Sequence, residues 1–404
     1  MNYENQKLII SDFLCGSEKS PEDYLIGAEL EYFVVDKNSH RSISYYKDNG
    51  IKSILKKLVA EGFKPAFENE NIIGVSNSDL AVTLEPGAQF EISLNPQKNL
   101  KALEQKFLNF DSILKPIIER NNQKLFSAGY QPVTKIEDVK IIPKKRYDFM
   151  QNYLSKQGNM ALNMMKGTAS VQVAVDYSSE KDFAEKMRLA SRLTPILSAV
   201  YDNSGIFEGK PYKNYCLRTK IWNNCDDARC GMIPQVFDAD FGYEKYAEYL
   251  LDLVPIFIPA DGYYLKCEKS FRECFDPPEN TTEQLNHMFS MSFPDVRARD
   301  YIELRMTDSL PYPLNFAFLE LVNELFYNNQ VFEEISKMLK NISLNDVNSA
   351  KVDAVKFSTS AELGSRAIID YFREIIDVIG DISSEHFYLN KELAESGILP
   401  RNMN

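Results

Sequence analysis

Two pairs of glutamates stand at even spacings in this sequence. Glu29 and Glu31 are two residues apart, and Glu85 and Glu91 are six apart. Side chains at even spacing share one face of a β-strand, and carboxylates on one face repel each other unless a cation lies between them. Mg²⁺ prefers carboxylate oxygens and completes its coordination with substrate phosphates. The spacing is therefore compatible with a site for two or three Mg²⁺ ions, provided that the bend at residues 86–87 preserves the strand phase. A solvated or salt-bridged sheet face is the alternative.

Cationic side chains alternate in the same way in two later segments. Arg218, Lys220 and Trp222 alternate with apolar residues, and so do Glu303 and Arg305. Arginine binds carboxylates and phosphates through two parallel hydrogen bonds, so these positions could hold an anionic substrate. They could equally be the counter-ions of the glutamates. Trp222 is either a packed aromatic residue or part of the same polar face.

The elements that must position these residues follow from hydrophobic periodicity. Alternation predicts strands at 25–35, 168–176, 217–222 and 301–307, and a hairpin over 72–94 with its turn at 77–79. Helical spacing predicts helices at 51–61, 100–121 and 180–200, and a largely helical part from 314 to 404. No fixed repeat or long linker interrupts the chain. We therefore expect one α+β domain covering residues 1–404.

Composition excludes several classes of protein. The 404 residues carry 46 Lys+Arg and 58 Asp+Glu, a net charge of −12, which argues against nucleic acid as a partner. No apolar run approaches the roughly 18 residues of a membrane span, so no membrane association is expected. The N-terminus lacks the pattern of a signal peptide, which makes a cytoplasmic protein the expectation.

The residues that usually mark other chemistries are scarce. There are six cysteines without a C-x-x-C pair and three scattered histidines, so any bound metal should have oxygen ligands. The sequence contains no G-x-G-x-x-G, and the segment GIFEGK at 205–210 lacks the spacing of a phosphate-binding loop. A nucleotide, if one binds, must be held in another way.

Several collinear segments resemble the glutamate-cysteine ligases of the plant and proteobacterial type, which are related in fold to glutamine synthetase. The match runs through residues 27–313 in the order of that family. The segments are GAELEY at 27–32, LEPGAQFEIS at 84–93, MMKGTASVQVAVDYSSE at 164–180, NSGIFEGKP at 203–211, LRTKIW at 217–222 and YIELRMTD at 301–308.

The resemblance implies a glutamine synthetase/guanidino kinase-like fold, in which an antiparallel sheet has a polar, concave active-site face covered by helices. It also implies an enzyme with ATP as co-substrate, in which the γ-carboxylate of L-glutamate becomes a γ-glutamyl phosphate. The amine of L-cysteine then displaces phosphate to give γ-glutamylcysteine, the first step of glutathione synthesis. Such a reaction needs charge neutralisation and positioning more than a protein nucleophile.

Matched by position, the resemblance also assigns roles to individual residues. The catalytic residues would be Glu29, Glu31 and Arg305. Substrate would be bound by Arg218, Lys220, Trp222 and Lys166. The nucleotide would contact Gln172, Glu303 and Arg305, and the Mg²⁺ ions would be held by Glu29, Glu31, Glu85 and Glu91.

Two departures from the family pattern affect the substrate. Plant members carry Arg before the T-x-x-V-Q-V segment, where this chain has Gly167, with Lys166 one place earlier. The Asn that usually follows V-Q-V is Ala174. A carboxylate-amine ligase with another acceptor amine therefore remains an alternative. A regulator that binds ATP or an amino acid without turnover is a further alternative, although a pure binder does not need several metal carboxylates.

Overall fold

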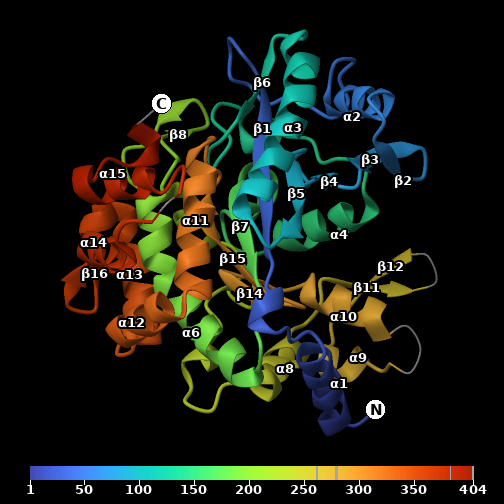
Figure 1. The fold of residues 1–404 in the computed structure, drawn as a ribbon. Coiled ribbons are helices and arrows are strands. Elements are labelled where there is room, and N and C mark those ends of the chain that lie inside the picture. Colours follow the sequence, from blue (N-terminus) through green and yellow to red (C-terminus); the bar gives the residue numbers. More distant parts are fainter. Residues whose placement is uncertain (261–262, 278–280, 383, 403–404) are drawn as a thin grey trace.

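The computed structural model describes residues 1–260, 263–277, 281–382 and 384–402. An antiparallel sheet runs through its centre and is flanked by helices (Figure 1). This arrangement confirms the predicted α+β class. Along the main path of the sheet the strands are β14 (Val296–Ala298), β15 (Ile302–Asp308), β7 (Ser170–Val175), β1 (Ile26–Asp36), β5 (Phe90–Gln97), β4 (Leu80–Leu84), β3 (Asn71–Ser76) and β2 (Lys64–Glu68), and β6 (Gln123–Phe126) pairs with the far end of β1.

Strand β1 is central and pairs with both β5 and β7. In this register Glu29 lies between Ser93 on β5 and Gln172 on β7, and Glu31 lies opposite Glu91 on β5. Residues that far apart in sequence therefore meet on one stretch of the sheet. Because side chains of a strand alternate between its two faces, the acidic positions of β1 share one face of the sheet.

Helices cover the sheet and its ends. Helix α6 packs against β15, α3 against β5 and α2 against β3. In Figure 1 the C-terminal helices α11–α15 gather beside α6, and α1 lies with α8–α10 at another end of the sheet. The helices are α1 (Tyr3–Cys15), α2 (Ile51–Ala60), α3 (Leu100–Glu119), α4 (Lys145–Leu154), α5 (Ala161–Gly167), α6 (Glu180–Val200), α7 (Leu217–Trp222), α8 (Tyr243–Asp252), α9 (Phe271–Cys274), α10 (Thr281–Phe289), α11 (Leu314–Tyr327), α12 (Asn329–Leu339), α13 (Leu344–Phe357), α14 (Ile368–Ile379) and α15 (Tyr388–Ser396).

Short strand pairs complete the described part of the chain. They are β8 (Ile206–Phe207) with β9 (Lys210–Pro211), β10 (Cys230–Gly231) with β13 (Phe293–Pro294), β11 (Phe257–Ala260) with β12 (Tyr263–Lys266), and β16 (Glu362–Leu363) with β17 (Arg366–Ala367). No helix in the described ranges has the length and apolar character needed to cross a lipid bilayer.

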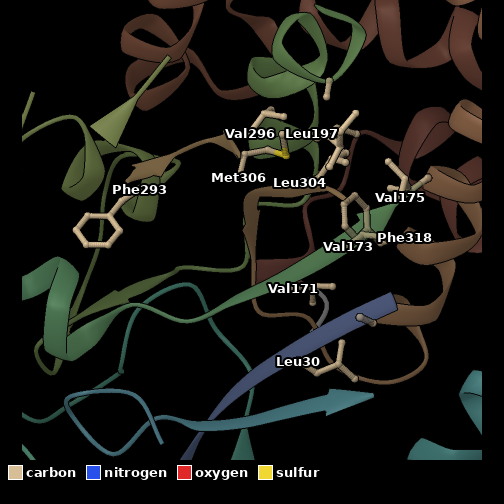
Figure 2. Packing of buried hydrophobic residues seen from close by; sticks show 14 of the residues in the cluster. Leu30, Val171, Val173, Val175, Leu197, Phe293, Val296, Leu304, Met306 and Phe318 are labelled. Carbon is tan, nitrogen blue, oxygen red and sulfur yellow. The ribbon is translucent and has the colours of Figure 1, made fainter. Parts of the chain in front are cut away.

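The apolar face of the central strands forms part of a continuous core. Figure 2 shows Val171, Val173 and Val175 of β7 packed near Leu304 of β15 and Phe318 of α11. All five side chains are buried. Burial of each such side chain contributes about 1.5–3 kcal/mol. One face of the sheet is thereby fixed to the helices, and the other face is left for polar residues.

The strand predicted over 217–222 is wrong, because these residues form helix α7. The backbone N–H of Lys220 donates to the carbonyl of Cys216, as in a helical turn. Leu217 and Ile221, four residues apart, are both buried. Six residues are too few for a pattern of period 2 to be told from one of period 3.6.

The predicted hairpin over 72–94 has its turn at 77–79, as expected, but its second strand is divided. Strand β4 ends at Leu84 and β5 begins at Phe90. Between them the N–H of Glu85 donates to the carbonyl of Gln89, which closes a second reversal. A Cβ at Gly87 would come within 2.1 Å of the carbonyl oxygen of Lys166, so only glycine fits there. Glu85 and Glu91 therefore do not share one strand, and the predicted common strand phase is wrong.

Candidate active site

A cavity of about 270 Å³ lies against the polar face of the central strands, and helices α4, α5 and α7 contribute to its walls. We call it the central cavity. Its lining combines carboxylates from the sheet with a group of cations. The acidic side chains are Glu29, Glu31, Glu85 and Glu91, and the cationic ones are Lys144, Arg146, Arg218, Arg297, Arg299 and Arg305.

Three different elements supply the four carboxylates. Glu29 and Glu31 project from β1, Glu91 from the neighbouring strand β5, and Glu85 from the loop that joins β4 to β5. Glu85 reaches the cavity because the chain reverses at residues 85–89, and not because it shares a strand with Glu91. Glu85 and Glu91 thus line one cavity as predicted, although the geometric reason given for it was incorrect.

Glu31 and Glu91 are held by hydrogen bonds. The carboxylate of Glu31 accepts from the N–H and Oγ of Ser170 at 2.6 and 2.9 Å and from Nε2 of Gln172 at 2.9 Å. The carboxylate of Glu91 accepts from Oγ1 of Thr83 and Oγ of Ser93. Burial and the nearby Glu85 raise the pKa of Glu31 to about 7. Burial, together with other cavity glutamates, raises the pKa of Glu91 well above its usual range.

Glu29 and Glu85 have no such partners. Neither carboxylate forms a hydrogen bond or ion pair with any residue in the described part of the chain. Burial and the charge of Glu303 raise the pKa of Glu29 to about 7. Carboxylate oxygens that lack protein donors fit a divalent metal.

The four glutamates are spread more widely than the ligands of a single ion. Within the described residues, the one compact group of potential ligand atoms lies outside the central cavity and consists of Glu104, Glu385 and His386. Mg²⁺ usually takes one or two carboxylates and keeps the rest of its shell for water and phosphate. The wider spacing thus suits more than one ion better than a single ion.

Arg305 is fixed at the side of the cavity by two partners. Its Nη1 donates to Oε2 of Glu303 at 2.9 Å and to Oε1 of Gln172. Oε2 of Glu303 also accepts from Nε of Arg297 at 2.9 Å. Burial alone would raise the pKa of Glu303, but Arg297 and Arg305 lower it to about 2. The carboxylate is therefore ionised, and it aligns two guanidinium groups that both line the cavity.

Helix α7 places Arg218 and Trp222 on the same side, one turn apart. The guanidinium carbon of Arg218 lies 5.1 Å from the centre of the Trp222 ring, and its Nη1 donates to the carbonyl of Met306 at 3.2 Å. Burial lowers the pKa of Arg218. Lys220 lies outside the cavity lining, with its Nζ 5.7 Å from the ring centre of Tyr212. A strand would have put all three together, whereas a helix separates positions i and i+2.

Several buried donors on the cavity residues have no hydrogen-bond partner. A buried donor left unpaired costs about 1–3 kcal/mol, so a set of them on one cavity indicates an anionic ligand with several oxygens. The unpaired atoms are Nε of Arg146, Arg218, Arg299 and Arg305, and Nε1 of Trp222.

The structure brings most of the predicted site residues together but leaves three outside the lining. Lys166 turns away, because its Nζ donates to the carbonyls of Ile136 at 2.8 Å and Val139 at 3.0 Å. Lys220 lies outside, as described, and Glu303 lies behind the two arginines that it holds. The predicted residues that do line the cavity are Glu29, Glu31, Glu85, Glu91, Gln172, Arg218, Trp222 and Arg305.

Sequence reasoning missed four cations of the lining. Lys144 and Arg146 stand at the start of helix α4, in a basic run, IPKKRY, that carried a usable signal. Arg297 and Arg299 alternate in the segment VRAR, which pairs with the predicted strand at 301–307. Extending that strand into a hairpin would have placed both arginines beside Arg305.

Comparisons with known proteins identify the family of this chain. The family model described as glutamate-cysteine ligase family 2 matches residues 25–376. The chloroplastic glutamate-cysteine ligase A of Oryza sativa subsp. japonica is 36% identical over 340 residues, which are 81% of this chain and 68% of the rice protein. The chloroplastic enzyme of Arabidopsis thaliana is 36% identical over 316 residues, 74% of this chain and 59% of that protein.

A solved structure shares the fold at low sequence identity. It is the glutamate-cysteine ligase of Francisella tularensis in complex with AMP, with a TM-score of 0.55 and 11% identity over 96% of this chain and 84% of that one. The expectation of a cytoplasmic protein is contradicted, because the similar plant enzymes are chloroplastic. The extent of the family match and the identity to the plant enzymes show that this chain belongs to glutamate-cysteine ligase family 2.

Proposed function

We propose that this chain uses ATP to join the γ-carboxylate of L-glutamate to the amine of L-cysteine, giving γ-glutamylcysteine, the first step of glutathione synthesis. The observation that carries the proposal is the pairing of opposites in the central cavity. The carboxylates of Glu29 and Glu85, which have no donor among the described residues, and several arginine Nε atoms, which have no acceptor there, line the same space. A substrate that brings phosphate oxygens and metal ions satisfies both sets at once.

The cations hold the anionic substrates in this proposal. Arg218, backed by the ring of Trp222, binds the α-carboxylate of glutamate, and Arg305 binds the phosphoryl group in transfer. Both offer an unpaired Nε to an incoming oxygen. Because Glu303 and Gln172 fix the Arg305 guanidinium, little freedom is lost when substrate binds. Gln172 also connects Arg305 to Glu31, because Nε2 of Gln172 donates to the carboxylate of Glu31.

The carboxylates would hold the metal. Glu29, Glu31, Glu85 and Glu91 are proposed to bind two or three Mg²⁺ ions together with the phosphates of ATP. Bound Mg²⁺ supplies charge neutralisation at the phosphate oxygens. The pKa values of Glu29 and Glu31 are raised because burial and neighbouring carboxylates outweigh the arginines of the cavity.

The reaction proceeds in two displacements. An oxygen of the glutamate γ-carboxylate forms a bond to the γ-phosphorus of ATP, and the bond to the bridging oxygen breaks to release ADP. The cysteine amine then attacks the acyl carbon, loses a proton, and phosphate leaves. Neither step requires a nucleophile from the protein, so the residues of the chain act by orienting substrates and balancing charge.

A second candidate has the same chemistry with a different acceptor amine. Gly167 stands where plant members carry Arg, and a Cβ there would lie 2.5 Å from the ring of Tyr130. An arginine therefore has no room in this fold, and Lys166 does not replace it because its amine is held by two carbonyls. A missing guanidinium near the site favours a change in substrate recognition.

Product analysis tests both candidates. Purified protein is incubated with ATP, Mg²⁺, glutamate and a panel of amino acids and amines, each component is omitted in turn, and products are identified by mass spectrometry. We expect γ-glutamylcysteine as the dominant product, with loss of product when ATP, Mg²⁺ or glutamate is left out. A different γ-glutamyl amide would move the acceptor and keep the mechanism. Binding of ATP without any product would contradict the proposal and favour a regulator.

A further inference from the structure

A second cavity, of about 510 Å³, lies beside strand β6 and shares no lining residue with the central cavity. We call it the β6 cavity. Its walls come from β6, from the loop at residues 203–206 and from the C-terminal segment. The residues that carry the argument are His40, Lys124, Phe126, Tyr130, Ser204 and Arg401. Its size is within the range of pockets that bind small molecules.

The lining of the β6 cavity contains cations and no carboxylate among the described residues. This is unusual for a chain with a net charge of −12. The charge of Arg401 is balanced, because its Nη1 donates to Oδ2 of Asp202 at 3.1 Å. Lys124 forms no ion pair with any described residue, and its Nζ lies 5.5 Å from the ring centre of Phe126. An unbalanced cation therefore stands at this cavity.

Aromatic side chains, among them the Phe126 ring next to Lys124, line the same cavity. The ring of His40 lies 5.8 Å from that of Phe126, and Tyr130 lies 5.1 Å from Phe207. Flat apolar faces beside a cation match a ligand with an anionic group on a planar body. Such a ligand gains both apolar burial and an ion pair with Lys124.

Another part of the lining is held by hydrogen bonds. The N–H of Asn203 and Oγ of Ser204 both donate to Oδ2 of Asp308, at 2.8 and 2.6 Å. These residues begin the segment NSGIFEGKP at 203–211, whose residues do not reach the central cavity. The segment therefore shapes a different space, and its hydrogen bonds keep that space open.

We propose that the β6 cavity is a second ligand site, which takes a small anion with a flat apolar body and depends on Lys124 for the charge. The site is separate from the proposed ligase reaction and does not rest on it. No residue assigned to substrate or metal takes part.

The proposal is tested with anilinonaphthalene sulfonate, an anionic aromatic dye whose fluorescence rises in apolar surroundings, titrated into the full chain with saturating ATP and Mg²⁺ present to fill the central cavity. We expect saturable binding. Lys124→Gln should weaken it about tenfold, and Lys124→Glu should weaken it further, because an ion pair to a ligand is lost or reversed. Uncharged anilinonaphthalene should bind all three proteins equally.

Lys56→Glu is the matched control. Lys56 is an exposed residue of helix α2, so the same change in net charge occurs away from the cavity. Its affinity for the dye should equal that of the unchanged protein, and thermal unfolding of each variant verifies its fold. Equal affinity in the Lys124 variants and the unchanged protein, or an equal loss in Lys56→Glu, would overturn the proposal.

Discussion

The central cavity and the β6 cavity differ in how their charges are balanced. In the central cavity, acids and cations face the same space, and each set retains atoms without partners. In the β6 cavity, the charged side chains of the described lining are all cationic, and Lys124 has no acidic partner there. The first arrangement suits a ligand that brings both positive and negative charge, such as a nucleotide with its metal. The second suits a simple anion.

The two cavities meet through strand β15. Arg305 lines the central cavity near the middle of this strand, and the carbonyl of Met306 accepts from Arg218. Asp308, at the end of β15, accepts from Asn203 and Ser204 in the wall of the β6 cavity. One strand thus supports two cavities with different charges in their linings. Substitutions in one cavity should affect turnover, and substitutions in the other should affect binding of an anion.

The largest effect is expected at Glu29, one of the two carboxylates of the central cavity without a hydrogen-bond partner among the described residues. Glu29→Gln should lower kcat roughly 1,000-fold, because a metal ligand is lost where charge must be neutralised in the transition state. The fold should be unchanged, since this carboxylate has no hydrogen bond to lose. Steady-state kinetics and circular dichroism make the measurement. Glu70→Gln, at an exposed carboxylate, is the control and should have normal kinetics. Full activity in Glu29→Gln would remove Glu29 from the metal site.

The second largest effect is expected at Arg305, which lines the same cavity as Glu29. Arg305→Lys should lower kcat/KM about 100-fold, because an ammonium group cannot donate to Glu303, Gln172 and a phosphate oxygen in one planar arrangement. The exposed Arg120→Lys serves as the matched change and should leave the rate unaltered. Unchanged kinetics in Arg305→Lys would show that a point charge is sufficient at this position.

The sequence predicted the central cavity better than it predicted the elements around it. The alternation along β1 identified Glu29 and Glu31 because a strand that is apolar on one face repeats every two residues over its whole length. For helix α7 the same alternation misled, because six residues fit either period. As a result, Lys220 was predicted to lie beside Arg218 and Trp222, whereas the helix directs it away from them.

Other parts of the site depended on contacts that no local pattern records. Glu85 enters the cavity through a tight reversal at residues 85–89, where Gly87 passes close to the backbone of Lys166. The role of Glu303 as the partner of two arginines follows from the pairing of β14 with β15. The β6 cavity joins residues from both ends of the chain, from His40 to Arg401, and had no signal in the sequence.

A smaller effect is expected at Asp308, which lies between the two cavities. Burial and the charge of Asp202 raise the pKa of Asp308 to about 7, from 3.8 in an unfolded chain. The folded state therefore holds this proton more tightly, and the stabilisation is complete below pH 3.8 and is lost as pH rises through 7. The contribution is roughly 4 kcal/mol. Asp308→Asn resembles the protonated form and should remove this loss of stability at high pH.

The measurement is the Tm of both proteins between pH 5 and 8. The Tm of Asp308→Asn minus that of the unchanged protein should increase as pH rises toward 7. Only the aspartate must ionise in a buried place, which destabilises the folded state. A difference that does not change with pH would show that the carboxylate has an ordinary pKa. This result would also mean that the wall between the two cavities is better hydrated than its burial indicates.

The smallest expected effect on turnover is at Lys124. This substitution tests most directly whether the two cavities act independently. Lys124→Glu should leave kcat and KM for ATP and glutamate within about twofold of the unchanged protein, because Lys124 does not line the central cavity and salt screens the charge of a side chain outside it. The same variant should lose affinity for the anionic dye. A large loss of turnover without added ligand would contradict the separation, because it would mean that the charge of the β6 cavity acts on the reacting groups through β15. Retained turnover with weakened dye binding would establish two independent sites on one sheet.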